Sequence, residues 1–120
     1  MKKERKQTKR TMRVVVMGVS GSGKSSVGAR LSRELRAVFL EGDSFHSEEA
    51  RARMEAGRPL DDESRRGWLL ALLDALQGEE RAVMACSALK RKYRDVLRRA
   101  GDVFFVHLAV RCAHCRVFFL

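Results

Sequence analysis

The sequence predicts an α/β fold in which a parallel sheet carries helices on both faces. Short apolar runs alternate with segments of helical spacing along the 120 residues, and this alternation is typical of parallel sheets. The first apolar run, residues 13–17, is unbroken, as expected for a strand buried on both faces. A glycine-rich loop and a helical pattern follow it directly, which is the order that a phosphate-binding loop requires.

The glycine-rich loop matches the pattern Gly-x-x-x-x-Gly-Lys-Ser. Its residues are Gly18, Val19, Ser20, Gly21, Ser22, Gly23, Lys24, Ser25 and Ser26. Glycines let backbone N–H groups approach phosphate oxygens, and the start of the following helix attracts the same anion. Lys24 can reach the β- and γ-phosphates, and the Ser25 hydroxyl can ligate Mg²⁺. A flexible linker is the alternative, but a linker is not expected between a β-branched strand and a helix. The loop predicts a nucleotide-binding site.

The other elements follow from apolar spacing and capping residues. Ser47 is a good N-cap, Gly57 is placed to end the helix that Ser47 begins, and Asp61 or Asp62 can cap the next helix. We expect Trp68, Leu69, Leu72, Leu73 and Leu76 to form a buried stripe. The predicted strands are 13–17, 37–41, 81–86 and 103 to about 109, and the predicted helices are 24–36, 48–56, 62–77 and 89 to about 100.

Polar residues follow each predicted strand. The phosphate loop follows the first, Glu41-Gly42-Asp43 the second, Cys86-Ser87-Ala88-Leu89-Lys90 the third and Arg111 the fourth. Ligands of parallel α/β sheets gather at the carboxyl ends of the strands. The fold should therefore bring most of these residues to one edge.

Charge and composition set the remaining expectations. Residues 1–13 carry a net charge of +6 out of the total of +10, so we predict a basic disordered tail over 1–11. The tail has no aromatic residue to stack on bases, so nucleic acid is not expected as a partner. No membrane-spanning run or signal sequence is found, and a cytoplasmic location is expected. Cys86, Cys112 and Cys115 predict neither a disulfide framework nor a zinc site, because the one CxxC lacks a second ligand pair.

Several motifs together resemble the gluconokinases, small kinases related to shikimate kinase and adenylate kinase. The resemblance covers about residues 13–108. It is carried by the phosphate loop, Gly42-Asp43 with His46, Met54, Gly57, Pro59-Leu60, Asp62, Arg65, Trp68-Leu69, Cys86-Ser87-Ala88-Leu89-Lys90 and Tyr93-Arg94-Asp95. It implies a three-layer P-loop NTPase fold for residues 12–110.

The implied reaction is transfer of the ATP γ-phosphoryl group to the 6-hydroxyl of D-gluconate, with Mg²⁺. By this resemblance Lys24, Asp43 and Arg65 would be catalytic, and Ser25 and Glu41 would lie at the metal. Asp43, His46, Arg65 and Lys90 would bind the substrate, with Arg65 engaging its carboxylate through two parallel hydrogen bonds. The alternatives are a turn role for Asp43, solvated side chains for Arg65 and Lys90, and an ordinary surface position for His46. Trp68 and Tyr93 are expected in the core, and a homodimer is a further expectation.

Two departures from the family bear on these expectations. Ser47, Ala50, Ser64 and Gly67 replace the usual Pro, Asn, Asp and Pro, and Ala50 removes a polar group from the presumed substrate pocket. Residues 111–120 match nothing in the family, which continues into a helix, an arginine-bearing lid and a last strand. We therefore expect the lid and last strand to be absent, the sheet edge to be exposed and turnover to be low. A non-catalytic ATP-binding fragment and a kinase with another acceptor are the alternative functions.

Overall fold

The computed structural model describes residues 11–18, 23–87, 90–111 and 114–119. Most of the predicted basic tail, Val19 to Ser22 of the phosphate loop, and Ala88 and Leu89 lie outside these residues. The helices are α2 (Lys24–Leu35), α3 (Glu48–Glu55), α4 (Asp62–Gln77) and α5 (Arg91–Leu97), with short 3₁₀ helices η1 (Gly42–Phe45) and η2 (Arg98–Ala100). The strands are β1 (Met12–Met17), β2 (Val38–Glu41), β3 (Arg81–Cys86), β4 (Val103–Arg111) and β5 (His114–Phe119).

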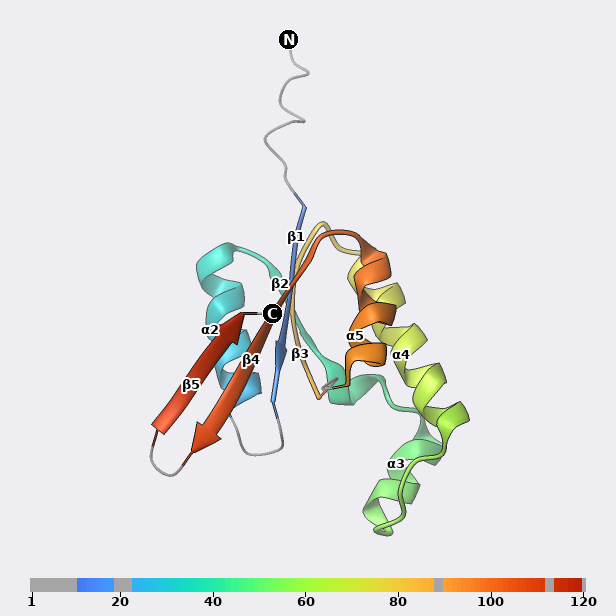
Figure 1. Ribbon diagram of the computed structural model, residues 1–120. Helices are drawn as coiled ribbons and strands as arrows, with labels where there is room; N and C mark the ends of the chain where they lie inside the picture. Colours follow the sequence, from blue (N-terminus) through green and yellow to red (C-terminus); the bar gives the residue numbers. More distant parts are fainter. Residues whose placement is uncertain (1–10, 19–22, 88–89, 112–113, 120) are drawn as a thin grey trace.

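These strands form one sheet in the order β2-β3-β1-β4-β5. The first four strands are parallel, as the alternation of strands and helices predicts. Figure 1 shows α2 on one face of the sheet and α4 with α5 on the other, while α3 lies away from the sheet beyond the end of α4. The predicted three-layer α/β fold is confirmed.

β5 corrects the expectation of an exposed sheet edge at β4. It pairs antiparallel with β4 from Val106 opposite Phe119 to Arg111 opposite His114. β-branched and aromatic residues at 117–119 favour extended structure, and two residues join the strands, a connection short enough for a hairpin. The motifs of the family resemblance do not predict this strand, because they end at about residue 108.

The core lies on both faces of the sheet because side chains alternate along each strand. On one face Val14 and Val16 pack near Leu31 and Leu35 of α2. On the other, Val15 and Met17 pack with the apolar stripe of α4. That stripe is buried as predicted, at Trp68, Leu69, Leu72, Leu73 and Leu76.

The predicted helix caps are also confirmed. The Ser47 side chain accepts a hydrogen bond from the Ala50 amide at 3.0 Å, and Asp61 accepts one from the Ser64 amide at 2.7 Å. The second bond identifies Asp61, not Asp62, as the cap of α4, and the Ser64 amide lowers the pKa of the Asp61 carboxyl.

Arg13 has a structural role, although in the sequence it ends the basic run of the N-terminal tail. Its Nε donates to the carbonyl oxygens of Leu76 and Glu79 at 2.8 and 3.0 Å, and its Nη1 donates to that of Ala100 at 2.9 Å. A cation at carbonyl groups near helix ends complements the helix dipoles. Arg13 therefore ties β1 to the ends of α4 and η2. Within the described residues no helix is long and apolar enough to cross a membrane.

Candidate functional site

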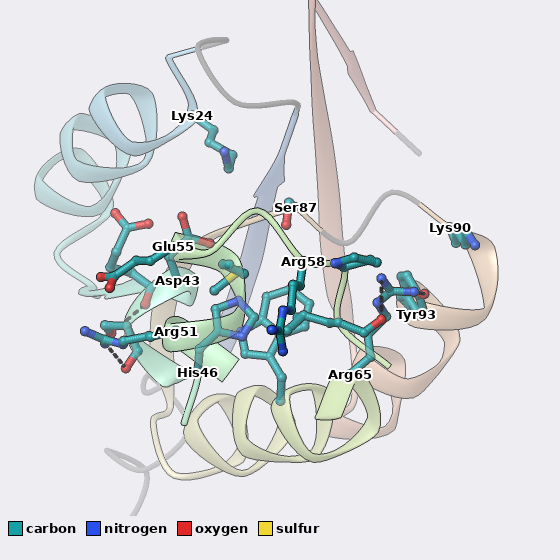
Figure 2. Close-up of a pocket in the computed structure, with 16 residues that line it drawn as sticks. Lys24, Asp43, His46, Arg51, Glu55, Arg58, Arg65, Ser87, Lys90 and Tyr93 are labelled. Carbon is teal, nitrogen blue, oxygen red and sulfur yellow. Dashed lines mark hydrogen bonds between the residues drawn. The ribbon is translucent and has the colours of Figure 1, made fainter. Parts of the chain in front are cut away.

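A cavity of about 1050 Å³ opens at the carboxyl ends of the parallel strands. It lies between the start of α2, the η1 turn, α3, the α3–α4 connection and the start of α5 (Figure 2). Its lining residues are Lys24, Glu41, Asp43, Ser44, His46, Arg51, Met54, Glu55, Arg58, Pro59, Leu60, Arg65, Trp68, Ser87, Lys90 and Tyr93. The predicted gathering of polar residues at this edge is thus observed for the first three strands; the side chain of Arg111 lies outside the described structure.

One end of the cavity is the start of α2, where Lys24 is 8% exposed. The preceding residue, Gly23, has a φ of 88°, a left-handed conformation that glycine adopts without strain. Among the described residues no side chain caps α2, and its first turn holds no acidic residue. The first N–H groups of a helix have no partner within the helix. This end of the cavity therefore suits a phosphate group.

Ser25 and Glu41, the two expected metal ligands, are in direct contact. Ser25 Oγ donates a hydrogen bond of 2.7 Å to Glu41 Oε1, which joins the start of α2 to the end of β2. A hydroxyl and a carboxylate are the hard oxygen ligands that Mg²⁺ prefers, and Mg²⁺ is commonly bound by one or two carboxylates together with substrate phosphates. These residues fit a Mg²⁺ ion at the phosphate end.

The η1 turn places Asp43 in the cavity. A Cβ atom on Gly42 would lie 2.5 Å from the Ala85 carbonyl oxygen, so this position accepts glycine alone. The Gly42 carbonyl accepts a hydrogen bond of 2.9 Å from the indole N–H of Trp68. Asp43 follows directly, exposed on the turn. The turn is therefore fixed on β3 and α4, and Asp43 is held on a rigid base.

His46 stacks on Trp68 at the wall of the cavity. The ring centroids are 4.6 Å apart and the planes differ by 10°. His46 Nδ1 is buried and has no hydrogen-bond partner within the described residues. Burial lowers the pKa of the imidazole; Asp43 opposes this shift and Arg51 adds to it. Trp68 is buried as predicted, yet it also forms part of the cavity wall.

Arg65 and Lys90 lie at the other end of the cavity. Arg65 Nη1 donates to the Tyr93 hydroxyl at 3.2 Å, and Nη2 to the Leu60 carbonyl at 3.4 Å. Lys90 is exposed, with its Nζ 5.8 Å from the centre of the Tyr93 ring. The sequence predicts Tyr93 in the core, whereas in the structure it is half-buried and also lines the cavity. Its hydroxyl accepts the hydrogen bond that holds Arg65 in place.

The structure thus brings together Lys24, Glu41, Asp43, His46, Arg65 and Lys90, with Ser25 beside Glu41. Ala50 and Ser64, the two departures from the family pattern that concern the acceptor, do not line the cavity. Ala50 is instead 2% exposed, in the core. Sequence reasoning missed three charged residues of the lining, Arg51, Glu55 and Arg58. The helical spacing of α3 was the available signal for Arg51 and Glu55, four positions apart on one face.

The cavity thus combines a helix start that suits phosphate with a separate cationic end, an arrangement typical of small-molecule kinases of the P-loop class. The chain belongs to the shikimate kinase family, since the model of that family matches residues 20–117.

Gluconokinases are among its relatives. The chain is 50% identical over 93 residues to a probable gluconokinase of Rattus norvegicus, covering 74% of this chain and 50% of that protein. It is 43% identical over 99 residues to the thermoresistant gluconokinase of Escherichia coli K12, covering 78% of this chain and 57% of that protein. A crystal structure of a gluconokinase from Sinorhizobium meliloti 1021 superposes with a TM-score of 0.79 at 46% identity, covering 84% of this chain and 59% of that protein. The chain spans about half the length of the curated relatives it matches.

Proposed function

We propose that this protein phosphorylates D-gluconate at the 6-hydroxyl with ATP, giving 6-phosphogluconate and ADP. One observation carries the proposal: Lys24, at the phosphate end, and Arg65, at the cationic end, line the same cavity. The similarity to proteins named gluconokinase supports D-gluconate as the acceptor.

The donor half would act by positioning and charge neutralisation, which supply most of the catalysis in phosphoryl transfer. The free amides at the start of α2 would bind phosphate oxygens, and Lys24 would bind the β- and γ-phosphates. Ser25 and Glu41 would hold Mg²⁺, which supplies positive charge to the nucleotide phosphates when it is bound. The buried position of Lys24 strengthens its interaction with an anion, because water screens it less.

The acceptor half would orient the sugar acid. Asp43 would accept the hydrogen bond of the 6-hydroxyl and then its proton, as the hydroxyl oxygen bonds to the γ-phosphorus. The bond between that phosphorus and the β–γ bridging oxygen breaks, and the electron pair leaves with ADP. Arg65, held by Tyr93 and Leu60, would bind the carboxylate at the far end of the molecule.

The partners proposed here are therefore D-gluconate and ATP. A homodimer and a cytoplasmic location stay predictions of the sequence.

The experiment is a panel of acceptors with MgATP, comprising D-gluconate, other sugar acids and shikimate. We expect gluconate to be the preferred acceptor and Lys24→Ala to abolish both nucleotide binding and transfer. Lys92→Ala is the matched control, because Lys92 is exposed and does not line the cavity. Preference for another acceptor would refute gluconate as the substrate, and nucleotide binding that survives Lys24→Ala would refute the donor site.

A further inference from the structure

Arg58 is a cation in the acceptor half of the cavity that none of the motifs singled out. We propose that Arg58 determines specificity by binding the acceptor's carboxylate together with Arg65. This inference rests on the proposed function and deepens it, since it states what the cavity requires of its acceptor. The acceptor class is an open-chain polyhydroxy acid with an anionic group at the end opposite the reacting hydroxyl.

The backbone at Arg58 is fixed by the end of α3. Gly57, with a φ of 76°, ends the helix in the left-handed conformation. The Gly57 amide donates to the Met54 carbonyl at 3.0 Å, and the Arg58 amide to the Arg53 carbonyl at 2.8 Å. This pair of bonds resembles the common glycine-terminated helix cap. The position of Arg58 is thus set by its neighbours.

The connection after Arg58 is held as well. Arg53 Nη1 donates to the Pro59 carbonyl at 3.3 Å, and the Arg53 guanidinium lies 3.9 Å from the Asp61 carboxylate. Asp61 in turn caps α4. The segment that carries Arg58 is therefore tied to both α3 and α4, and its side chain starts from an ordered base at the mouth of the cavity.

The Arg58 side chain reaches into the cavity near His46 and Arg65 (Figure 2). Within the described part of the chain, its guanidinium forms no hydrogen bond or ion pair. The other two arginines of the lining are engaged: Arg65 with Tyr93 and Leu60, and Arg51 with the Ser44 carbonyl at 3.1 Å. All five donors of Arg58 are thus available to a ligand.

Carboxylate chemistry accounts for a pair of guanidinium groups. A carboxylate has about four lone-pair sites, so it can accept from more than one arginine. The hydrogen bonds of Arg65 to Tyr93 and Leu60 keep its orientation fixed, while Arg58 is free to close on the bound anion. A neutral polyol would leave both guanidinium groups without an anionic partner, and sites built around such groups discriminate strongly against ligands that lack the partner.

The test measures D-gluconate binding by calorimetry to the chain saturated with Mg²⁺ and a non-hydrolysable ATP analogue. We compare the wild type with Arg58→Gln, Arg58→Lys and the control Arg66→Gln, which alters the exposed arginine beside Arg65 that does not line the cavity. We expect Arg58→Gln to weaken gluconate binding about 10- to 100-fold, as the loss of charged hydrogen bonds predicts. Arg58→Lys should fall between, because lysine keeps the charge but loses the planar fork.

Three control measurements distinguish a loss of carboxylate binding from misfolding of the variants. Nucleotide affinity and the melting temperature should be the same in all variants, which excludes misfolding. D-glucitol, the neutral analogue of gluconate, should bind weakly and with the same affinity to all variants. A gluconate affinity of Arg58→Gln within about twofold of the wild type would overturn this inference alone. A wild-type chain that binds the nucleotide and no sugar acid would overturn the proposed function, and this inference with it.

Discussion

Ser25 Oγ and Glu41 Oε1 are joined by a hydrogen bond of 2.7 Å between the first turn of α2 and the last residue of β2. These residues are 16 positions apart in the chain, and the parallel sheet brings them together. The bond holds two oxygen atoms side by side at the phosphate end of the cavity. The proposed Mg²⁺ site rests on this pair of oxygen atoms.

Glu41→Gln tests this placement, because it removes the charge and keeps the shape. We expect the affinity for MgATP to fall roughly 10- to 100-fold, the usual range when a group that supports a metal is altered. The affinity for ATP without Mg²⁺ should stay the same or rise, since a negative charge near the phosphates is lost. Titrations with and without Mg²⁺ measure both. Glu48→Gln, an exposed acid that does not line the cavity, is the control; an unchanged Mg²⁺ requirement in Glu41→Gln would contradict the placement.

Two glycines give opposite stability predictions. Gly42→Ala places a Cβ 2.5 Å from the Ala85 carbonyl oxygen, so the turn that carries Asp43 must move away from β3. We expect a loss of about 3 kcal/mol or more in the free energy of unfolding, or failure to fold. At Gly67, inside α4, a Cβ atom would meet no other atom within 4 Å. Gly67→Ala should therefore stabilise the protein by about 0.5–1 kcal/mol, because alanine favours the helix.

Urea unfolding of both variants measures these free energies. A Gly42→Ala protein as stable as the wild type would show that η1 is not packed on β3 as described. The Gly67→Ala protein checks that glycine replacement as such does not destabilise the chain.

The stack of His46 on Trp68 predicts a pH dependence of stability. Burial lowers the pKa of His46 below its usual value of 6.5, with Arg51 adding to the shift and Asp43 opposing it. The unfolded chain therefore binds the proton at a higher pH than the folded chain does. The contribution of neutral His46 to the free energy of unfolding is fully present above about pH 6.5, and it decreases as the pH falls toward the pKa of His46 in the folded chain.

Unfolding free energies of the wild type and His46→Gln, compared from pH 7.5 to pH 5, isolate this contribution, because the other titrating groups are shared. We expect the wild type to lose more stability than His46→Gln over this range. Equal losses, or a larger loss in the variant, would contradict the lowered pKa.

Arg13 should stabilise the fold without affecting the cavity. Its guanidinium donates to carbonyl oxygens of Leu76, Glu79 and Ala100, and removing it leaves these groups without their charged donor. Arg13→Gln should cost about 2–4 kcal/mol of unfolding free energy, with nucleotide affinity unchanged. Arg30→Gln is the control, since Arg30 forms only an exposed ion pair with Glu34 at 3.7 Å among the described residues, and such pairs contribute less than about 1 kcal/mol. Equal effects of the two variants would refute the role of Arg13.

The parts of the fold that could be predicted from the sequence depend on local signals. Ser47 and Asp61 are capping residues at helix starts, and the apolar spacing of α4 is long enough to identify its buried face. The phosphate loop could be recognised because its chemistry demands glycines and a lysine at fixed positions. The position of Asp43 and Glu41 at the cavity follows from the rule that ligands gather at the carboxyl ends of parallel strands, whereas their expected roles come from the family resemblance.

The parts that were missed depend on contacts between distant segments. Arg58 follows a helix-ending glycine, and no local pattern shows that the connection folds back so that its side chain faces the cavity. Arg13 sits at the end of a run of basic residues, and its partners are more than sixty positions away. The pairing of β5 with β4 was also missed, because β5 lies beyond residue 108, where the motifs of the family resemblance end.

In the proposed reaction one cavity binds the phosphates of ATP at Lys24 and a sugar acid at Arg65, and the γ-phosphoryl group passes from the first to the second. The most direct measurement follows a mixture of the protein, MgATP and D-gluconate by ³¹P NMR. We expect a phosphomonoester signal of 6-phosphogluconate that grows with time, is absent with Lys24→Ala and is strongly reduced with Arg65→Gln. ATP converted to ADP and inorganic phosphate at the same rate with and without gluconate, and no sugar phosphate formed, would contradict it.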